Sequence, residues 1–266
     1  MDARKFEEVE FHNRLRDHAL HDDPAAFRAM TANRKYYSVA GGSMDYYKDW
    51  LRRHCRDKVV LDFGCGDGLY SMFLAREGAR RVHGIDISDI SVENCRRQAA
   101  REGVADKTVF EVMDCEALTY PDETFDIVSE AGVLHHLALE PAIAEMARVV
   151  KRDGQVICYE AVGHNPLFQL YRNATPGLRT KYETEHILRM KDLRMMRRYF
   201  GRIDVRFFHL AVLLGVPFRK LPGFRLLHAT LEGLDRALLK IPGVRQQAWM
   251  MIFVMSESRR VGAAHV

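Results

Sequence analysis

The chain has 266 residues, of which 47% are hydrophobic, so it can bury the core of one large domain. Its net charge is +4, but residues 186–266 contain 15 Lys and Arg against 5 Asp and Glu and carry +10, which leaves −6 for residues 1–185. The charged start MDARKFEEVE and a longest nearly unbroken apolar run of 12 residues, FFHLAVLLGVPF, argue against a secretory signal and a membrane span.

The cysteines show neither paired spacing nor the spacing of a metal site. They are Cys55, Cys65, Cys95, Cys115 and Cys158. An odd number of scattered cysteines is typical of reduced thiols, so we expect a cytoplasmic protein without a bound metal. The basic C-terminal third favours an anionic partner such as phosphate, lipid headgroups or nucleic acid, and a solvated basic face explains it equally well.

Along the chain, residues 1–55 are predicted to form an N-terminal helical lid, and residues 56–266 to form the main domain. The main domain opens with strand patterns that alternate with helix patterns. The strands are KVVLDF, RVHGIDI, TVFEVMD, FDIVSEA and QVICYEAV, and the helices are GLYSMFLAREG, SVENCRRQAAREG and LEPAIAEMARVVKRDG. This alternation predicts a doubly wound α/β fold around a mostly parallel sheet.

Two further strands, IDVRFFHL and WMMIFVMSE, bring the predicted sheet to seven strands. Helical insertions are expected at residues 163–200, after the fifth strand, and at residues 211–247, between the sixth and seventh strands. We find no low-complexity linker, so the insertions elaborate one domain.

A glycine-rich turn follows the first strand, where ligands of such sheets bind. The dinucleotide fingerprint G-x-G-x-x-G fails here because Leu69 stands at the third glycine, and Asp62 and Asp67 would repel a pyrophosphate. A cationic ligand without phosphate, such as S-adenosylmethionine, fits better. Gly64 and Gly66 leave room for its methionine part, and a carboxylate can hold its ammonium group.

Two more acids end the next two predicted strands. Asp86 can accept hydrogen bonds from both ribose hydroxyls, a contact that NAD sites share. Asp114 can accept a hydrogen bond from an adenine amino group. One acid at each of three successive strand ends is a much more specific signal than the glycines alone.

Residues 58–161 resemble a class I S-adenosylmethionine-dependent methyltransferase, of the branch that includes ubiquinone/menaquinone-type and natural-product enzymes. The matching segments are VLDFGCGDG, VHGIDIS, VMDCEAL, FDIVSEAGVLHHL and EMARVVKRDGQVICYEA. The resemblance implies a Rossmann-like methyltransferase fold and S-adenosylmethionine as cofactor. The contact residues that it implies are Asp62, Gly64, Gly66, Asp86, Ile87, Asp114, Cys115, Ser129, Glu130 and Ala131.

The segment EAVGHNPLFQLYRNATPGLRTKYETEHIL is similar to one that follows the fifth strand in uncharacterised members of this branch. We expect it to cover the mouth of the cofactor cleft and to face the acceptor. The substrate-binding candidates are Tyr36, Tyr37, Glu160, His164, Asn165, Tyr171 and Arg172. The candidate bases are His12 on the lid, the adjacent His135 and His136, and His186. Each histidine has a structural interpretation as well, and the two tyrosines either shield the sulfonium or belong to the core.

The favoured function is direct in-line methyl transfer to a small, lipophilic acceptor. Nothing in the sequence chooses among oxygen, nitrogen, carbon and sulfur as the methylated atom, or indicates the oligomeric state. A nucleic-acid methyltransferase is a weaker alternative, because the basic residues are interleaved with Leu, Phe and Met. A protein that binds the cofactor without transferring a methyl group also stays open, and the glycine spacing argues against a dehydrogenase.

A short repeat suggests a membrane contact within residues 211–247. KLPGFR and KIPGVR bracket one predicted helix, whose apolar stripe consists of Leu227, Leu231, Leu234, Leu238 and Ile241. Basic residues gather at its two ends: Lys220, Arg225, Lys240 and Arg245. This pattern predicts either a helix that packs over the sheet or a helix that lies on an anionic membrane surface.

Overall fold

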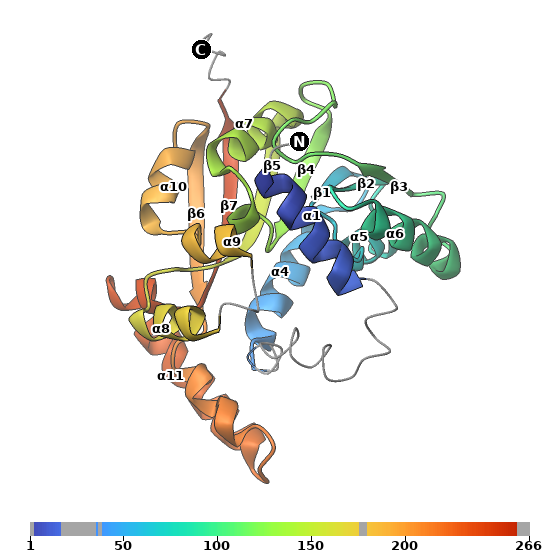
Figure 1. The fold of residues 1–266 in the computed structure, drawn as a ribbon. Coiled ribbons are helices and arrows are strands. Elements are labelled where there is room, and N and C mark those ends of the chain that lie inside the picture. The colour runs from blue at the N-terminus through green and yellow to red at the C-terminus, as the bar shows by residue number, and fades with distance from the viewer. Residues whose placement is uncertain (1–2, 17–35, 37–38, 176–179, 260–266) are drawn as a thin grey trace.

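The computed structural model describes residues 3–16, 36, 39–175 and 180–259. Its centre is a seven-stranded sheet in the order β3-β2-β1-β4-β5-β7-β6 (Figure 1). The strands are β1 (Val59–Phe63), β2 (Arg81–Asp86), β3 (Thr108–Val112), β4 (Phe125–Ala131), β5 (Val150–Ala161), β6 (Phe200–Phe208) and β7 (Met250–Ser258). Strands β1 to β5 pair in parallel, and β7 runs antiparallel to both β5 and β6. The predicted doubly wound, mostly parallel sheet of seven strands is confirmed.

Helices cover both faces of this sheet. The α-helices are α1 (Ala3–Arg16), α4 (Gly41–His54), α5 (Leu69–Arg76), α6 (Asp89–Glu102), α7 (Leu139–Val149), α8 (Pro166–Ala174), α9 (Lys181–Glu185), α10 (Met190–Met196) and α11 (Phe224–Leu238), with 3-10 turns η2 (Leu134–His136), η4 (Ala211–Phe218) and η5 (Val244–Gln247). One core contains side chains of α7 and α10, and a second contains side chains of α4, α5 and α6. The two cores account for the alternation read from the sequence, since strands buried on both faces need helices on both sides.

The boundary between α7 and β5 differs from the prediction. The expected helix ran on to Gly154, whereas α7 ends at Val149 and β5 begins at Val150, which pairs with Phe125 of β4. Lys151 is held on the sheet by an ion pair with Asp126 whose nitrogen and oxygen lie 2.7 Å apart. Contacts with β4 therefore hold residues 150–154 in a strand, although their sequence pattern is helical.

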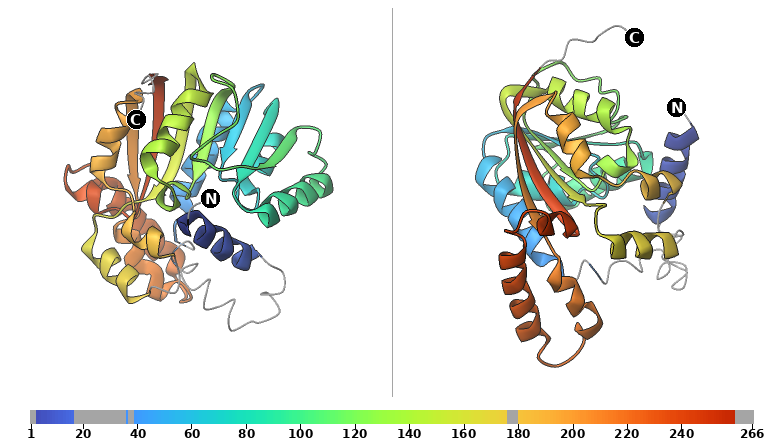
Figure 2. Two further views of the ribbon diagram at one scale, coloured as in Figure 1. Left: turned by 45° about the horizontal axis from the view of Figure 1, so that its top comes forward. Right: turned by 90° about the vertical axis from the view of Figure 1, so that its left-hand side faces the viewer.

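The insertion between β6 and β7 forms a helical hairpin. The 3-10 turn η4 and helix α11 pack together through Val212, Val216, Phe224 and Leu231, and the hairpin projects beyond the ends of the strands (Figure 1 and Figure 2). Asp235 of α11 accepts hydrogen bonds from the backbone amides at the start of η4, which fixes the two elements together. None of the helices in the described part of the chain is both long enough and apolar enough to span a membrane.

Candidate functional site

A cavity of about 210 Å³ lies beneath α1, at the carboxyl ends of β1, β2, β3 and β4. Eight of the ten predicted cofactor contacts line it: Asp62, Gly64, Gly66, Asp86, Ile87, Asp114, Cys115 and Ala131. The other two, Ser129 and Glu130, are fully buried in β4 behind the lining. The fold thus brings the three strand-end acids to one cavity, where parallel α/β sheets bind their ligands.

The glycine turn after β1 forms the floor of this cavity. Gly64 has a φ of 73°, in the left-handed region, and a Cβ atom there would lie 2.5 Å from Val133 Cγ2. Only glycine satisfies both restrictions. The amide of Cys65 donates to the carbonyl of Ile85 at 2.7 Å, which holds the turn against the end of β2.

Two of the acids are held in place by this turn and its surroundings. Asp86 accepts hydrogen bonds from the amides of Gly66 and Ser88, both at 2.9 Å. Asp62 accepts a hydrogen bond from the Ser71 hydroxyl at 2.5 Å. Burial, together with the charges of Asp67 and Asp86, raises the pKa of Asp62 to about 6. The carboxylates are therefore pre-oriented, and their mutual repulsion favours a cationic ligand.

Helix α1 closes the cavity through ion pairs. Lys5 Nζ lies 2.5 Å from an oxygen of Asp114 and 2.9 Å from one of Glu116. Arg4 binds Glu116 and donates to the carbonyl of His136 at 2.8 Å. The cavity is smaller than the roughly 300–1,000 Å³ of most small-molecule pockets. Residues of α1 thus cover the cavity in this structure.

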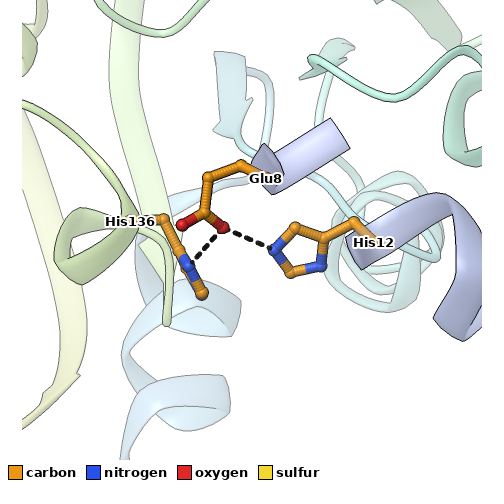
Figure 3. Close-up of side chains that lie close together, drawn as sticks. All are labelled: Glu8, His12 and His136. Atoms are coloured by element: carbon orange, nitrogen blue, oxygen red, sulfur yellow. Dashed lines mark ion pairs between the residues drawn. The ribbon is translucent and has the colours of Figure 1, made fainter. Parts of the chain in front are cut away.

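Two of the predicted bases, His12 and His136, line this cavity on either side of Glu8 (Figure 3). The third, His135, lies on η2 beside His136, with 4.3 Å between the ring centroids, and lines a second cavity. The fourth, His186, is exposed, stacks on Tyr182 and contacts the carbonyl of that residue. His186 belongs to the lining of neither cavity among the described residues.

The second cavity has largely aromatic and apolar walls. Its lining residues are Tyr36, His135, Ala161, Val162, Phe168, Tyr171, Arg172, Glu183, Ile187 and Trp249. They include three of the predicted substrate contacts, Tyr36, Tyr171 and Arg172, while Tyr37 falls outside the described residues. Tyr36 contacts the rings of both Tyr171 and Trp249. Residues from four separate parts of the chain (36, 135, 161–187 and 249) thus form one largely apolar pocket next to the first cavity.

The other predicted substrate contacts have local roles. Asn165 accepts a hydrogen bond from the amide of Leu167 at the start of α8 and donates to the carbonyl of Gln247 at 2.8 Å. It therefore ties the two insertions together. His164 accepts a hydrogen bond from the amide of Met190, the first residue of α10.

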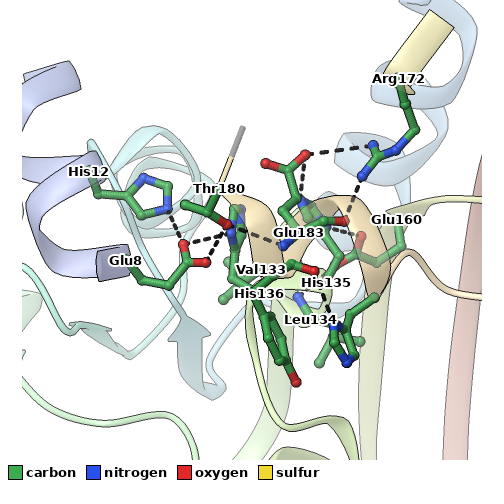
Figure 4. A network of polar contacts seen from close by, with 12 residues as sticks. Glu8, His12, Val133, Leu134, His135, His136, Glu160, Arg172, Thr180 and Glu183 are labelled. Atoms are coloured by element: carbon green, nitrogen blue, oxygen red, sulfur yellow. Dashed lines mark hydrogen bonds and ion pairs between the residues drawn. The ribbon is translucent and has the colours of Figure 1, made fainter. Parts of the chain in front are cut away.

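A buried polar network lies behind η2 (Figure 4). Glu160 binds His135 Nδ1 at 2.7 Å and the amide of Leu134 at 2.6 Å, and Glu130 accepts from the amide of Val133 at 2.6 Å. Burial raises the pKa of Glu160 to about 7 and that of Glu130 well above its usual range. Burial also lowers the pKa of His135. Glu130 and Glu160 thus fix the turn that separates the two cavities.

Sequence reasoning missed several residues that the fold brings to these cavities. They are Arg4, Lys5, Glu8, Val133 and Leu137 at the first cavity and Phe168, Glu183 and Trp249 at the second. The one available signal was the four-residue spacing of Glu8 and His12, which places both side chains on one face of a helix.

Comparisons with known proteins agree with this architecture. Residues 61–158 match the model of a family described as "Methyltransferase domain". A ubiquinone biosynthesis O-methyltransferase of Neisseria meningitidis serogroup C (strain 053442) is 35% identical over 127 residues, which are 46% of this chain and 52% of that protein. A 27-O-demethylrifamycin SV methyltransferase of Amycolatopsis mediterranei (strain S699) is 37% identical over 98 residues, 36% of each protein. The chain thus matches about half or less of the length of these relatives.

Solved structures share the fold at low sequence identity. The geranyl diphosphate C-methyltransferase from Streptomyces coelicolor A3(2), in complex with Mg²⁺, geranyl diphosphate and S-adenosyl-L-homocysteine, has a TM-score of 0.63 at 13% identity. That match covers 96% of this chain and 98% of the other. The [4+2]-cyclase SpnF has a TM-score of 0.54 at 20% identity, with 80% of each chain covered. At these identities the likeness shows the fold alone.

Proposed function

Because residues 61–158 form a class I S-adenosylmethionine-dependent methyltransferase domain, we propose that this chain transfers a methyl group from S-adenosylmethionine to a small, lipophilic acceptor. The observation that carries the proposal is the pair of neighbouring cavities, one with three strand-end carboxylates and the other with aromatic walls. The two basic side chains over the first cavity, Arg4 and Lys5, are ion-paired with Glu116 and Asp114. Such a carboxylate-rich cavity suits a ligand that is cationic at one end and hydroxylated at the other.

The residues present fit this cofactor. Asp62 would hold the ammonium group, Asp86 the ribose hydroxyls and Asp114 the adenine amino group, while Gly64 allows close backbone approach. S-adenosylmethionine supplies a methyl group that its sulfonium already activates. The task left to the protein is to align the acceptor with that group and to exclude water.

The turn η2 is suited to this alignment. His136 lines the first cavity and the adjacent His135 lines the second. An acceptor in the second cavity would therefore be separated from the cofactor site by η2. Glu160 binds His135 at Nδ1, and Nε2 lies 3.9 Å from Glu183 in the wall of the second cavity. We therefore assign His135 the role of accepting a hydrogen bond from a hydroxyl or amine acceptor and orienting it.

The walls of the second cavity favour a lipophilic acceptor. Phe168, Tyr171 and Trp249 offer broad apolar surfaces, and such aromatic side chains dominate the energetics of apolar burial. Helix α8 contributes three of the lining residues, while Leu167 and Leu170 on the same helix are 74% and 68% exposed. One helix thus borders the acceptor pocket on one side and presents leucines to the solvent on the other.

A labelling experiment tests the proposed activity. Purified protein is incubated with methyl-labelled S-adenosylmethionine and, separately, with a lipid extract, a hydrophilic metabolite extract and bulk RNA. We expect label in an organic-phase small molecule, because the second cavity is apolar. Label in RNA would favour a nucleic-acid methyltransferase. Cofactor binding without label in any fraction would show a cofactor-binding protein that does not transfer methyl groups.

We further propose that α8 and the 211–247 insertion contact an anionic membrane, from which a lipophilic acceptor is drawn. Most of the exposed large hydrophobic side chains lie in these two segments: Leu167, Leu170, Leu214, Phe218, Leu221, Leu226, Leu227, Leu234 and Ile241. Of the predicted stripe, Leu227, Leu234 and Ile241 are exposed, whereas Leu231 packs on η4.

The charges of the hairpin complement an anionic surface. Residues 211–247 contain six Lys and Arg against two Asp and Glu, and one of those acids, Asp235, is buried as the cap of η4. Lys220 and Arg225 are the sequence neighbours of the exposed Leu221 and Leu226, where η4 is followed by α11. Apolar side chains beside basic ones are the pattern of an interfacial contact.

Co-sedimentation with vesicles tests this contact. We expect binding to vesicles that contain phosphatidylglycerol, and weaker binding at high salt or with phosphatidylcholine alone. Each basic residue near the surface contributes about 1 kcal/mol, so Lys220→Gln with Arg225→Gln should weaken partitioning roughly 25-fold. Leu221→Asp with Leu226→Asp should abolish binding, whereas Val112→Asp, an exposed apolar site on β3, should not. Equal binding of all variants would contradict the proposal.

A further inference from the structure

Three potential metal ligands meet at the wall of the first cavity. Glu8 and His12 lie one turn apart on α1, and His136 comes from η2 (Figure 3). Glu8 Oε2 lies 2.9 Å from His136 Nδ1 and 3.6 Å from His12 Nε2, and the three ligand atoms all lie within 4.8 Å of one another. One carboxylate and two imidazoles form a donor set that divalent transition metals use.

The contacts within the cluster are ion pairs between Glu8 Oε2 and the two imidazoles. Glu8 Oε2 and His136 Nδ1 are both buried, and neither makes a hydrogen bond of acceptable geometry although they lie 2.9 Å apart. Metal–ligand bonds of about 2.1 Å place neighbouring ligand atoms roughly 3.0–3.4 Å apart, close to the two separations found here. Two of the three separations between ligand atoms are therefore near those around a small cation, and the third is within 4.8 Å.

The carboxylate also has the outer support that metal ligands have. Its other oxygen, Oε1, accepts a hydrogen bond from the Thr180 hydroxyl at 2.6 Å (Figure 4). Glu8 is only 4% exposed, so its orientation is fixed by packing as well. Such second contacts orient ligating side chains and strengthen metal binding.

We propose that Glu8, His12 and His136 bind one divalent transition-metal ion of the Zn²⁺ class. Three protein ligands leave at least one coordination position open, as in catalytic zinc sites, and all three residues line the first cavity. The ion would also join the lid helix α1 to η2. Cysteine spacing gave no sign of this site, because its ligands are a glutamate and two histidines that come from separate segments.

Metal content measured on the tag-free full chain tests the proposal independently of any methyl transfer. The protein is treated with a chelator, dialysed to equilibrium against micromolar Zn²⁺, and assayed for zinc per chain. We expect about one ion per chain. Glu8→Gln, His12→Asn and His136→Asn should each weaken binding by at least about tenfold, the loss that even outer contacts of a metal site cause. Thr180→Val should weaken it about 10- to 100-fold.

Matched variants keep the test specific. Glu7→Gln changes the exposed neighbour of Glu8 on the same helix, and His186→Asn removes an exposed histidine outside the cluster, so both should retain wild-type zinc. Circular dichroism of each variant verifies the fold. Visible absorption after Co²⁺ substitution should show the bands of a four- or five-coordinate ion, which Glu8→Gln abolishes. The proposal is overturned if the wild-type protein retains no more zinc than Glu8→Gln, or if Glu7→Gln loses as much.

Discussion

The substitution Asp86→Ala should weaken binding of S-adenosylmethionine by about 1.5–3 kcal/mol, roughly 10- to 150-fold, the range of charge-assisted hydrogen bonds. Asp86 is 8% exposed and lines the first cavity, where its carboxylate can accept from the ribose hydroxyls. It also accepts hydrogen bonds from the amides of Gly66 and Ser88, so the substitution removes one hydrogen bond that holds the glycine turn as well. Isothermal titration with S-adenosylmethionine and with S-adenosylhomocysteine measures the loss.

Two comparisons make this titration decisive. Asp106→Ala removes a carboxylate from an exposed loop and should leave both affinities unchanged. NAD should bind wild-type protein more weakly than S-adenosylmethionine, because Asp62 and Asp67 disfavour a pyrophosphate at the glycine turn. Tighter binding of NAD would refute the cofactor assignment.

The cofactor end of the site was predictable because its signals are local. Asp62, Asp86 and Asp114 each lie within two residues of the end of a strand that the apolar pattern reveals, and parallel strands carry their carboxyl ends to one edge. The glycine turn is likewise read from five consecutive residues, GCGDG at 64–68. Such features depend on the secondary structure and on the topology, both of which the alternation of strands and helices predicts.

The rest of the site depends on packing between distant segments. Lys5 meets Asp114 across 109 positions, and Trp249 reaches the second cavity from the start of the last strand. The local sequence does not indicate where α1 packs, or which residues a given histidine contacts. The sequence also could not tell whether Glu130 of β4 lines the cavity or is buried behind it. A strand buried on both faces has no alternation of polar and apolar residues that would distinguish the two sides.

Cofactor affinity should fall as the pH drops through the pKa of Asp62. Burial, with Asp67 and Asp86 nearby, raises that pKa to about 6 in the free protein, and only the ionised carboxylate can hold the ammonium group. The amino group, with a pKa near 7.7–8.0, stays protonated below pH 7. At pH 5 about nine-tenths of Asp62 is protonated, so affinity should be about tenfold weaker than at pH 7.

Two variants identify the titrating group. The Ser71 hydroxyl donates a hydrogen bond to Asp62, which lowers the pKa of that carboxyl group. Ser71→Ala should therefore raise the pKa of Asp62, and the loss of affinity should begin at a higher pH than in the wild type. Asp62→Asn should bind weakly at pH 7 and should flatten the pH profile between 5 and 7, because no proton has to leave. Titrations in two buffers of different ionisation enthalpy should show the release of about one proton on binding at pH 5. A pH slope that survives Asp62→Asn would assign the titration to another group in the cavity, and this account of the ammonium site would fail.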